Sequence, residues 1–262
     1  MNPTPIIKIE NLETSYGPRK VLDGINLEIM PGETMAILGR SGCGKSTLLR
    51  HLIGLSKPSA GNIYIKGQNL TSLSEEEWLP IRRKIGMLFQ SAALFNSMTV
   101  GDNVALPLRE HTALEESTIK IMTRMKLDQV GLAGFEDFMP AQLSGGMKKR
   151  AALARAIAMD PDILFCDEPS AGLDPIVAVG IDHLILKLKK AFRMTIVVVT
   201  HELASVFLIA DRVALLDGGR IIALGTVDEL KQSDNPKVQQ FFNRIPDPEK
   251  IDRESYLNSL IE

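Results

Sequence analysis

The residues most capable of chemistry lie in a glycine-rich turn, GRSGCGKS, from Gly39 to Ser46. The β-prone run TMAIL precedes this turn and the helix-forming stretch STLLRHLIGL follows it. Such a turn points backbone N–H groups inward at phosphate oxygens, and the helix start adds positive charge. An ordinary tight turn is the alternative, but the placement between strand and helix favours a nucleotide site. The expected binding residues are Gly39, Arg40, Ser41, Gly42, Cys43, Gly44, Lys45, Ser46 and Thr47.

Two adjacent acids end an apolar run in ILFCDEPSAGLD, namely Asp167 and Glu168. Adjacent strand residues point to opposite sides of a sheet, so the two carboxylates are expected to have different roles. Beside a phosphate turn whose Lys45 reaches the β- and γ-phosphates, Asp167 and Ser46 are assigned to Mg²⁺. Glu168 is assigned to the water that attacks the γ-phosphate. A solvated acidic turn is the alternative, and it leaves the preceding apolar residues unexplained.

Two further polar residues follow strand-like runs. His201 follows the apolar run TIVVVT, and Gln90 ends KIGMLFQ. A strand-end histidine is often a hydrogen-bonded structural residue, but beside a phosphate turn we expect it to contact the γ-phosphate. The neutral side chain of Gln90 is expected to touch Mg²⁺ or the attacking water. Glu168, His201 and Gln90 are therefore the candidate catalytic residues.

A second glycine-rich helix opening, QLSGGMKKRAALARA, starts at Gln142. Ser144, Gly145 and Gly146 would present a hydroxyl and free amides at a helix N-terminus, which suits a γ-phosphate. The stretch lacks the Gly-Lys-Ser/Thr of a phosphate loop, so it should not hold a nucleotide unaided. A simple N-cap is the structural alternative, which leaves the paired glycines unexplained.

Composition limits the partners that this chain can have. The formal charge is -2 with a pI near 6.1. The chain therefore lacks the overall positive electrostatic field that non-specific nucleic-acid binding needs. Only two cysteines occur, as fits a reducing compartment. The N-terminal residues show no secretory signal, and the apolar runs fall far short of the roughly 20 residues that span a bilayer. A membrane role would therefore require a partner.

The order of apolar patterns predicts the architecture. Short strand-like runs fill the sequence before Gly39 and return from DILFCDE onward, with helical periodicity in between, from Ser91 to about Ala158. Apolar runs without alternation indicate strands buried on both faces, hence a mainly parallel sheet covered by helices. The region 91–158 is interpreted as a helical subdomain inserted into the sheet domain.

Taken together and in order, these motifs resemble the ATP-binding cassette (ABC) family, the ATPase subunits of ABC transporters. The resemblance runs from about Ile6 to Leu230 and includes LSGGM as the family signature, with Tyr16 as the adenine-stacking aromatic. It implies an α/β, P-loop NTPase fold with a mainly parallel sheet core, an antiparallel β subdomain and an inserted helical subdomain. The expected ATPase domain spans 1–230, with a core of about 1–90 and 159–230, and an extension at 231–262 follows.

The resemblance also implies why two anion-binding helix starts occur. In this family two cassettes stack head to tail, and each ATP lies between the phosphate loop of one and the signature helix of the other. ATP and Mg²⁺ are therefore the expected ligands, and a second copy is the expected partner. A differential affinity for the closed pair is what lets a nucleotide drive a conformational change.

The stretch FQSAALFNSMTVGDNVALPLREHT is similar to the ATPases of Mce-type lipid transport systems, which include the Mla type of Gram-negative bacteria. Met147 and Lys148 differ from the residues usual in nutrient importers. The similarity implies a peripheral ATPase on the cytoplasmic face of the bacterial inner membrane, with a membrane permease, a lipid-binding periplasmic component and no nucleic acid. An importer for a small polar solute is the alternative, followed by a soluble ABC protein of translation or DNA repair.

Two smaller hypotheses complete the interpretation. Cys43 lies near a helix start, a position that can lower a thiol pKa and support a redox switch. The tail from Gln240 is expected to clasp the partner cassette, and its apolar residues are Phe241, Phe242, Tyr256, Leu257 and Ile261. A frayed end is the alternative for the tail.

Overall fold

The computed structural model describes residues 4–246. A four-stranded antiparallel sheet has the order β2-β1-β4-β5. Its long strands β1 (Ile7–Tyr16) and β2 (Arg19–Ile29) form a hairpin, and β4 (Ala60–Ile65) and β5 (Gln68–Asn69) complete the sheet. Buried and exposed side chains largely alternate along β1, as in a sheet with one face on the core.

The second sheet has six strands in the order β10-β9-β3-β8-β7-β6. All but β10 are parallel, and every residue of β3 and β8 is buried. These strands are the apolar runs without alternation, which confirms the predicted parallel core. The strands are β3 (Thr34–Gly39), β6 (Ile85–Leu88), β7 (Ile163–Asp167), β8 (Thr195–Thr200), β9 (Arg212–Asp217) and β10 (Arg220–Gly225).

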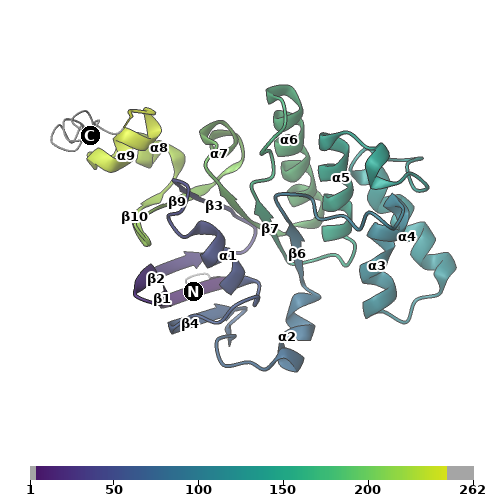
Figure 1. Cartoon of the computed structure of the whole chain (residues 1–262), viewed down its shortest axis with the longest axis horizontal. Helices are drawn as coiled ribbons and strands as arrows, with labels where there is room; N and C mark the ends of the chain where they lie inside the picture. Colours follow the sequence, from purple (N-terminus) through teal and green to yellow (C-terminus); the bar gives the residue numbers. More distant parts are fainter. Residues whose placement is uncertain (1–3, 247–262) are drawn as a thin grey trace, which may run out of the picture.

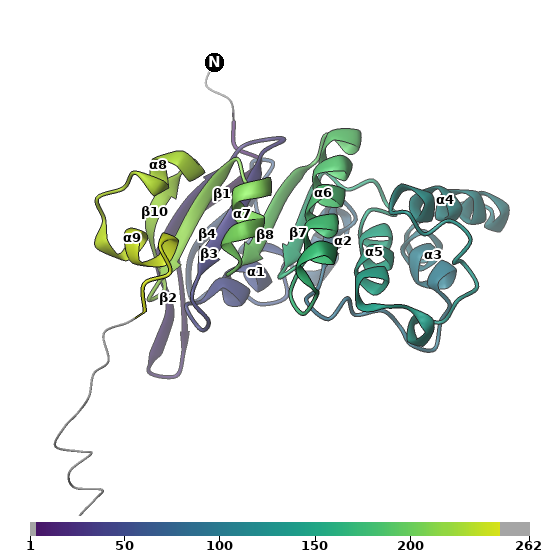
Figure 2. The same ribbon diagram turned by 90° about the horizontal axis from the view of Figure 1, so that it is seen from above.

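Helices surround this sheet and gather at both ends of the elongated molecule (Figures 1 and 2). Next to the sheets lie α1 (Lys45–Leu52), α2 (Glu75–Arg82), α6 (Pro175–Phe192) and α7 (Leu203–Ile209). One end carries α3 (Val100–His111), α4 (Glu116–Gln129), a 3₁₀ turn (Pro140–Gln142) and α5 (Gly145–Ala156). The other end carries α8 (Val227–Lys231) and α9 (Pro236–Phe242).

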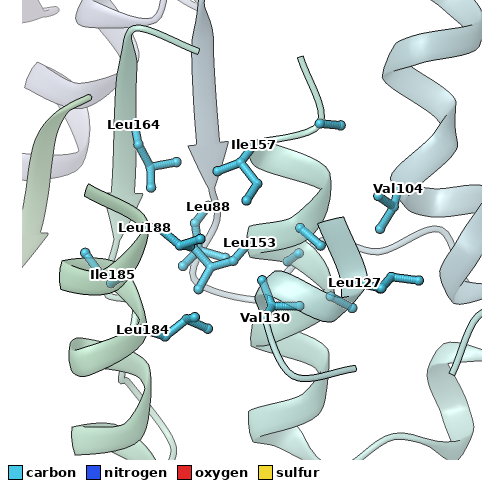
Figure 3. Close-up of a cluster of buried hydrophobic side chains, with 14 of the residues drawn as sticks. Leu88, Val104, Leu127, Val130, Leu153, Ile157, Leu164, Leu184, Ile185 and Leu188 are labelled. Atoms are coloured by element: carbon cyan, nitrogen blue, oxygen red, sulfur yellow. The ribbon is translucent and has the colours of Figure 1, made fainter. Parts of the chain in front are cut away.

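One apolar cluster joins the helical end to the sheet (Figure 3). Leu153 of α5, Leu188 of α6 and Leu88 of β6 are all buried members of it. Each such side chain contributes about 1.5–3 kcal/mol on burial. The helices α3 and α4 are therefore held to the sheet mainly through α5, the helix that opens with the signature sequence.

Several elements depart from the sequence-based expectation. The helices α2, α7 and α9 were not predicted, and α9 occupies part of the stretch that was interpreted as a tail. Gln90 lies two residues beyond the end of β6 rather than at its last position. None of the helices between residues 4 and 246 combines the length and apolar character that crossing a membrane requires.

Candidate functional site

A hollow of about 700 Å³ opens at the carboxyl ends of β3, β7 and β8. Because these strands are parallel, the segments that follow them meet at one edge of the sheet. The hollow is lined by Val21, Arg40, Ser41, Gly42, Gly44, Lys45, Ser46, Thr47, Gln90, Asp167, Glu168, His201 and Phe241. The structure thus brings together most of the sequence-predicted site, and it adds Val21 and Phe241, which no motif indicated.

The glycine-rich turn has the backbone that a phosphate loop needs. Gly44 caps α1 with a positive φ of 109°, and a Cβ there would lie 2.7 Å from Leu22 Cδ2. Lys45 is buried, and its Nζ donates to the carbonyl oxygens of Gly39 (2.7 Å) and Arg40 (3.0 Å). The side chain is held across its own loop, with the first amides of α1 beside it. This arrangement suits a polyphosphate.

Cys43 and Gly39 support the turn from behind and do not line the hollow. A Cβ on Gly39 would lie 2.3 Å from the Leu216 carbonyl oxygen and 2.7 Å from Cys43 Sγ, so only glycine fits there. Burial raises the pKa of the Cys43 thiol, and this effect outweighs the nearby charge of Lys45. The expectation of a lowered thiol pKa is therefore wrong, because Cys43 is packed into the core.

The two carboxylates line the same hollow, which corrects the prediction that they point to opposite sides. The strand β7 ends at Asp167, and Glu168 has a positive φ of 45°. Strand alternation stops at that point, while the Glu168 amide still donates to the Val199 carbonyl at 2.8 Å. A left-handed backbone at a non-glycine residue costs about 1–3 kcal/mol. Such residues concentrate at functional sites, where the direction of a side chain has to be fixed.

Both oxygens of the Glu168 carboxylate have partners within the chain. Oε1 lies 2.7 Å from His201 Nδ1, and Oε2 accepts a hydrogen bond from Thr200 Oγ1 at 3.0 Å. The Glu168 side chain is buried, whereas His201 is half exposed at 54%. The pair therefore forms a buried acceptor joined to a solvent-facing imidazole, which can hold a proton at the edge of the hollow.

Asp167 and its surroundings fit a magnesium ion that arrives with a nucleotide. Burial raises the pKa of Asp167, and the neighbouring Glu168 charge raises it further. A divalent cation would offset both effects. Within residues 4–246 no three His, Cys, Asp or Glu side chains cluster as a metal site. Mg²⁺ commonly takes one or two carboxylates and completes its shell with phosphates and water, so Asp167 with the Ser46 hydroxyl suffices.

Two cations on α5 hold the segment around Gln90, and sequence motifs did not reveal them. Lys149 is buried, and its Nζ donates to the Gln90 carbonyl at 2.5 Å and to the Glu168 carbonyl at 3.1 Å. Burial lowers the pKa of Lys149. Arg155 donates to the carbonyl oxygens of Ala92 and Ala93. A lysine six residues from an arginine on one helix was the only signal in the sequence.

The signature segment lies outside the hollow of its own chain. Ser144 is the N-cap of α5, and its Oγ accepts from the Met147 amide at 3.3 Å, so the simple cap is present. Ser144 and Gly145 are exposed, whereas Gly146 is buried. A Cβ on Gly146 would lie 2.5 Å from Val177 Cγ1 of α6. The second glycine thus has a packing reason that the sequence did not show.

The remaining predicted residues lie at the edges of the site or outside the description. Tyr16, at the end of β1, is 54% exposed and is not among the residues that line the hollow. Phe241 of α9 lines the hollow, and Phe242 packs on Phe207 of α7 with ring centroids 5.8 Å apart. The other three apolar residues of the proposed clasp, Tyr256, Leu257 and Ile261, lie outside the described residues.

The chain is similar to proteins of one family. A family model described as ABC transporter matches residues 22–171. The intermembrane phospholipid transport system ATP-binding protein MlaF of Haemophilus influenzae is 43% identical over 260 residues, which are 98% of each chain. The probable ribonucleotide transport ATP-binding protein mkl of Mycobacterium leprae is 41% identical over 90% of this chain and 68% of its own.

A solved structure of an ATP-binding cassette is also similar to this chain. The dimeric post-hydrolysis state of the ATP-binding cassette MJ0796, bound to ADP and Pi, has a TM-score of 0.78 and 34% sequence identity. The match covers 84% of this chain and 98% of that one.

Replacing Gly146 with Ala should destabilise the chain, because the new Cβ would collide with Val177. Overpacking of this kind costs about 1–3 kcal/mol, which exceeds the helix propensity that Ala gains. Urea unfolding measures the loss. In the double variant Gly146→Ala/Val177→Ala, the total loss should be smaller than the sum of the two single losses. Additive losses would contradict a direct contact between α5 and α6 at this point.

Lys149→Met should lower the free energy of unfolding by about 1–3 kcal/mol, because two carbonyl oxygens lose their donor. Lys149→Arg, which keeps charge and donors, should lose less. The matched control is Lys148→Met on the same helix, which should stay within about 0.5 kcal/mol of the wild type. Equal losses at the two lysines in urea unfolding would show that the two hydrogen bonds of Lys149 contribute nothing.

Proposed function

This chain belongs to the ABC transporter family, and we propose that it binds and hydrolyses ATP to drive phospholipid transport between bacterial membranes. The observation that carries the choice of phospholipid is the 43% identity over 98% of both chains with a relative named for that transport. A second candidate cargo is a small polar solute, since a relative 41% identical is named for ribonucleotide transport. That match covers less of the relative's own length.

ATP would bind along the glycine-rich turn, with its phosphates on the α1 amides. Lys45 would exchange its two loop carbonyls for phosphate oxygens and so bring positive charge to them. Ser46, Asp167 and Gln90 would hold Mg²⁺, which neutralises charge on the phosphate oxygens. Tyr16, exposed at the end of β1, would stack on the adenine.

Hydrolysis would depend on the pair formed by Glu168 and His201. Glu168 would accept the proton of the attacking water, which requires that Oε1 or Oε2 leave its present partner. His201 is exposed enough to turn from Glu168 toward the γ-phosphate. The buried position of Glu168 keeps bulk water from competing for its carboxylate.

A second copy of the chain would complete each site. Ser144 and Gly145 are exposed and do not line the hollow of their own chain. They lie at the start of a 12-residue helix, where a hydroxyl and backbone amides are available to bind an anion held by a second copy of the chain. We infer a head-to-tail homodimer in which these groups meet the γ-phosphate held by the partner.

A separate permease would dock in a second hollow of about 550 Å³ between β6 and the helices α3 and α5. Its lining includes Phe89, Phe95 and Pro107 together with Arg82, Arg83 and Arg155. Phe95 is 51% exposed, and the Arg155 guanidinium lies 5.9 Å from its ring centroid. Aromatic and apolar side chains with arginines beside them suit an amphipathic helix. The chain would then sit on the cytoplasmic face of the inner membrane, with a lipid-binding periplasmic component on the other side of the permease.

Glu168→Gln should trap a dimer in Mg-ATP, because the variant keeps the binding groups and loses the proton acceptor. Size-exclusion chromatography with light scattering would show twice the monomer mass. Lys45→Ala is the control and should stay monomeric, since its phosphate contacts are gone. A Glu168→Gln variant that remains monomeric in saturating Mg-ATP would contradict the dimer model.

Purification of the tagged chain from detergent-solubilised membranes should recover a hydrophobic permease. Phe95→Asp should lose the permease, because a charge would replace an aromatic side chain of the second hollow. Ile121→Asp is the matched control, an exposed apolar residue of α4 outside this hollow, and should keep the permease. Recovery of ribosomes or DNA instead would contradict a transporter.

The cargo is tested with the recovered complex in vesicles. ATP should drive transfer of phospholipid between the complex and acceptor vesicles, and Glu168→Gln should abolish it. ATP-dependent movement of ribonucleotides without phospholipid transfer would favour the second candidate.

A further inference from the structure

Near the hollow, three buried polar side chains from three different segments meet. They are Asp182 of α6, Ser205 of α7 and Ser170 of the loop after β7, exposed by 2%, 5% and 6% respectively. Ser205 Oγ lies 2.7 Å from Asp182 Oδ2 and 3.2 Å from Ser170 Oγ. None of the three belongs to the phosphate loop, the signature or the predicted catalytic set.

The donors in this chain of hydroxyls can be assigned. A hydroxyl has one proton, and Ser205 donates it to the carboxylate of Asp182. Ser170 must then donate to Ser205 Oγ. The hydrogen bonds run in one direction, from the loop after β7 through α7 to α6, and Asp182 is the terminal acceptor.

Packing alone gives no reason for a carboxylate at this position. Asp182 Oδ1 is buried and has no hydrogen-bond partner, and burial raises the pKa of the carboxyl. A buried charge with one polar partner is costly, and an apolar side chain would fill such a place at lower cost. The cost points to a role outside stability, because strained or costly groups concentrate where geometry has to be fixed.

The location of the two serines indicates what is fixed. Ser170 is two residues after Glu168, and Ser205 is four residues after His201. The two segments are already joined at Glu168, whose carboxylate contacts His201 at 2.7 Å and Thr200 at 3.0 Å. The serines join the same two segments at a second place, further along each of them. Links at two places restrain the angle between the segments as well as their distance, which contacts at one place cannot do.

We propose that Asp182, acting through Ser205 and Ser170, fixes the segments that carry Glu168 and His201 relative to each other and is a positioning residue for ATP hydrolysis. The inference rests on the proposed roles of Glu168 and His201. Its consequence is specific to turnover, because nucleotide binding depends on Lys45 and the amides of α1, which lie outside this chain of hydroxyls.

The test measures the ATPase activity of the chain purified with its membrane partner. Ser205→Ala and Asp182→Ala should each lower kcat about tenfold, a modest loss for a misplaced reacting group. KM and the affinity for a non-hydrolysable ATP analogue should not change. Asp182→Asn keeps an acceptor for Ser205 and should retain most of the turnover. The matched control Ile185→Val, also on α6, should lower the melting temperature and leave kcat unchanged.

Two comparisons separate positioning from general loss of structure. The double variant Asp182→Ala/Ser205→Ala should be no slower than either single variant, because both remove the same link. In a His201→Ala background, Ser205→Ala should have no further effect on single-turnover hydrolysis. A Ser205→Ala variant with wild-type kcat would overturn the inference, and so would a full tenfold loss in the absence of His201.

The variant Glu168→Gln distinguishes this inference from its premise. If Glu168→Gln stops turnover while Ser205→Ala and Asp182→Ala do not affect it, only the positioning role fails. If Glu168→Gln itself turns over normally, the proposed function of the site fails, and the positioning role fails with it.

Discussion

Parallel pairing of β3, β8 and β7 is the constraint from which the rest of the site follows. The register places Leu38 beside Thr200 and Asp167 beside Val199, so all three strands end at one level. The glycine-rich turn, the carboxylates and His201 therefore meet because the strands that carry them are neighbours. They are the last residues of three neighbouring strands or the residues that follow directly, and the strands are held by side chains buried on both faces.

The helix α5 connects that edge to the remainder of the molecule. Its N-terminus carries the signature, its buried Lys149 reaches the backbone of both Gln90 and Glu168, and its Arg155 holds the loop beside the second hollow. Close packing of Gly146 against Val177 fixes the same helix to α6. A displacement of α5 would therefore alter the nucleotide site and the proposed permease site together, because the hydrogen bonds of Lys149 and Arg155 and the close contact at Gly146 leave little room for movement.

Sequence reasoning recovered the groups that local patterns encode. The glycine-rich turn, its strand and its helix form one continuous motif, and buried parallel strands appear as plain apolar runs. It failed where the determinant is non-local. Glu168 turns inward because its φ is positive, the Cys43 thiol is buried by residues far along the chain, and Lys149 finds acceptors 59 and 19 residues away. The short helix α7 has only seven residues and little periodicity to detect.

The division of polar groups within one chain bears on how hydrolysis is controlled. Both oxygens of Glu168 have hydrogen-bond partners within its own chain, while Ser144 and Gly145 are exposed and do not line the hollow. In a single chain, the carboxylate of Glu168 is therefore already hydrogen-bonded, and the hollow lacks the hydrogen-bond donors of the signature segment. If a partner supplies those donors, closure would add the missing groups at the same moment that His201 is drawn from Glu168 toward the phosphate. Turnover would then require assembly rather than nucleotide binding alone, as coupling to transport demands.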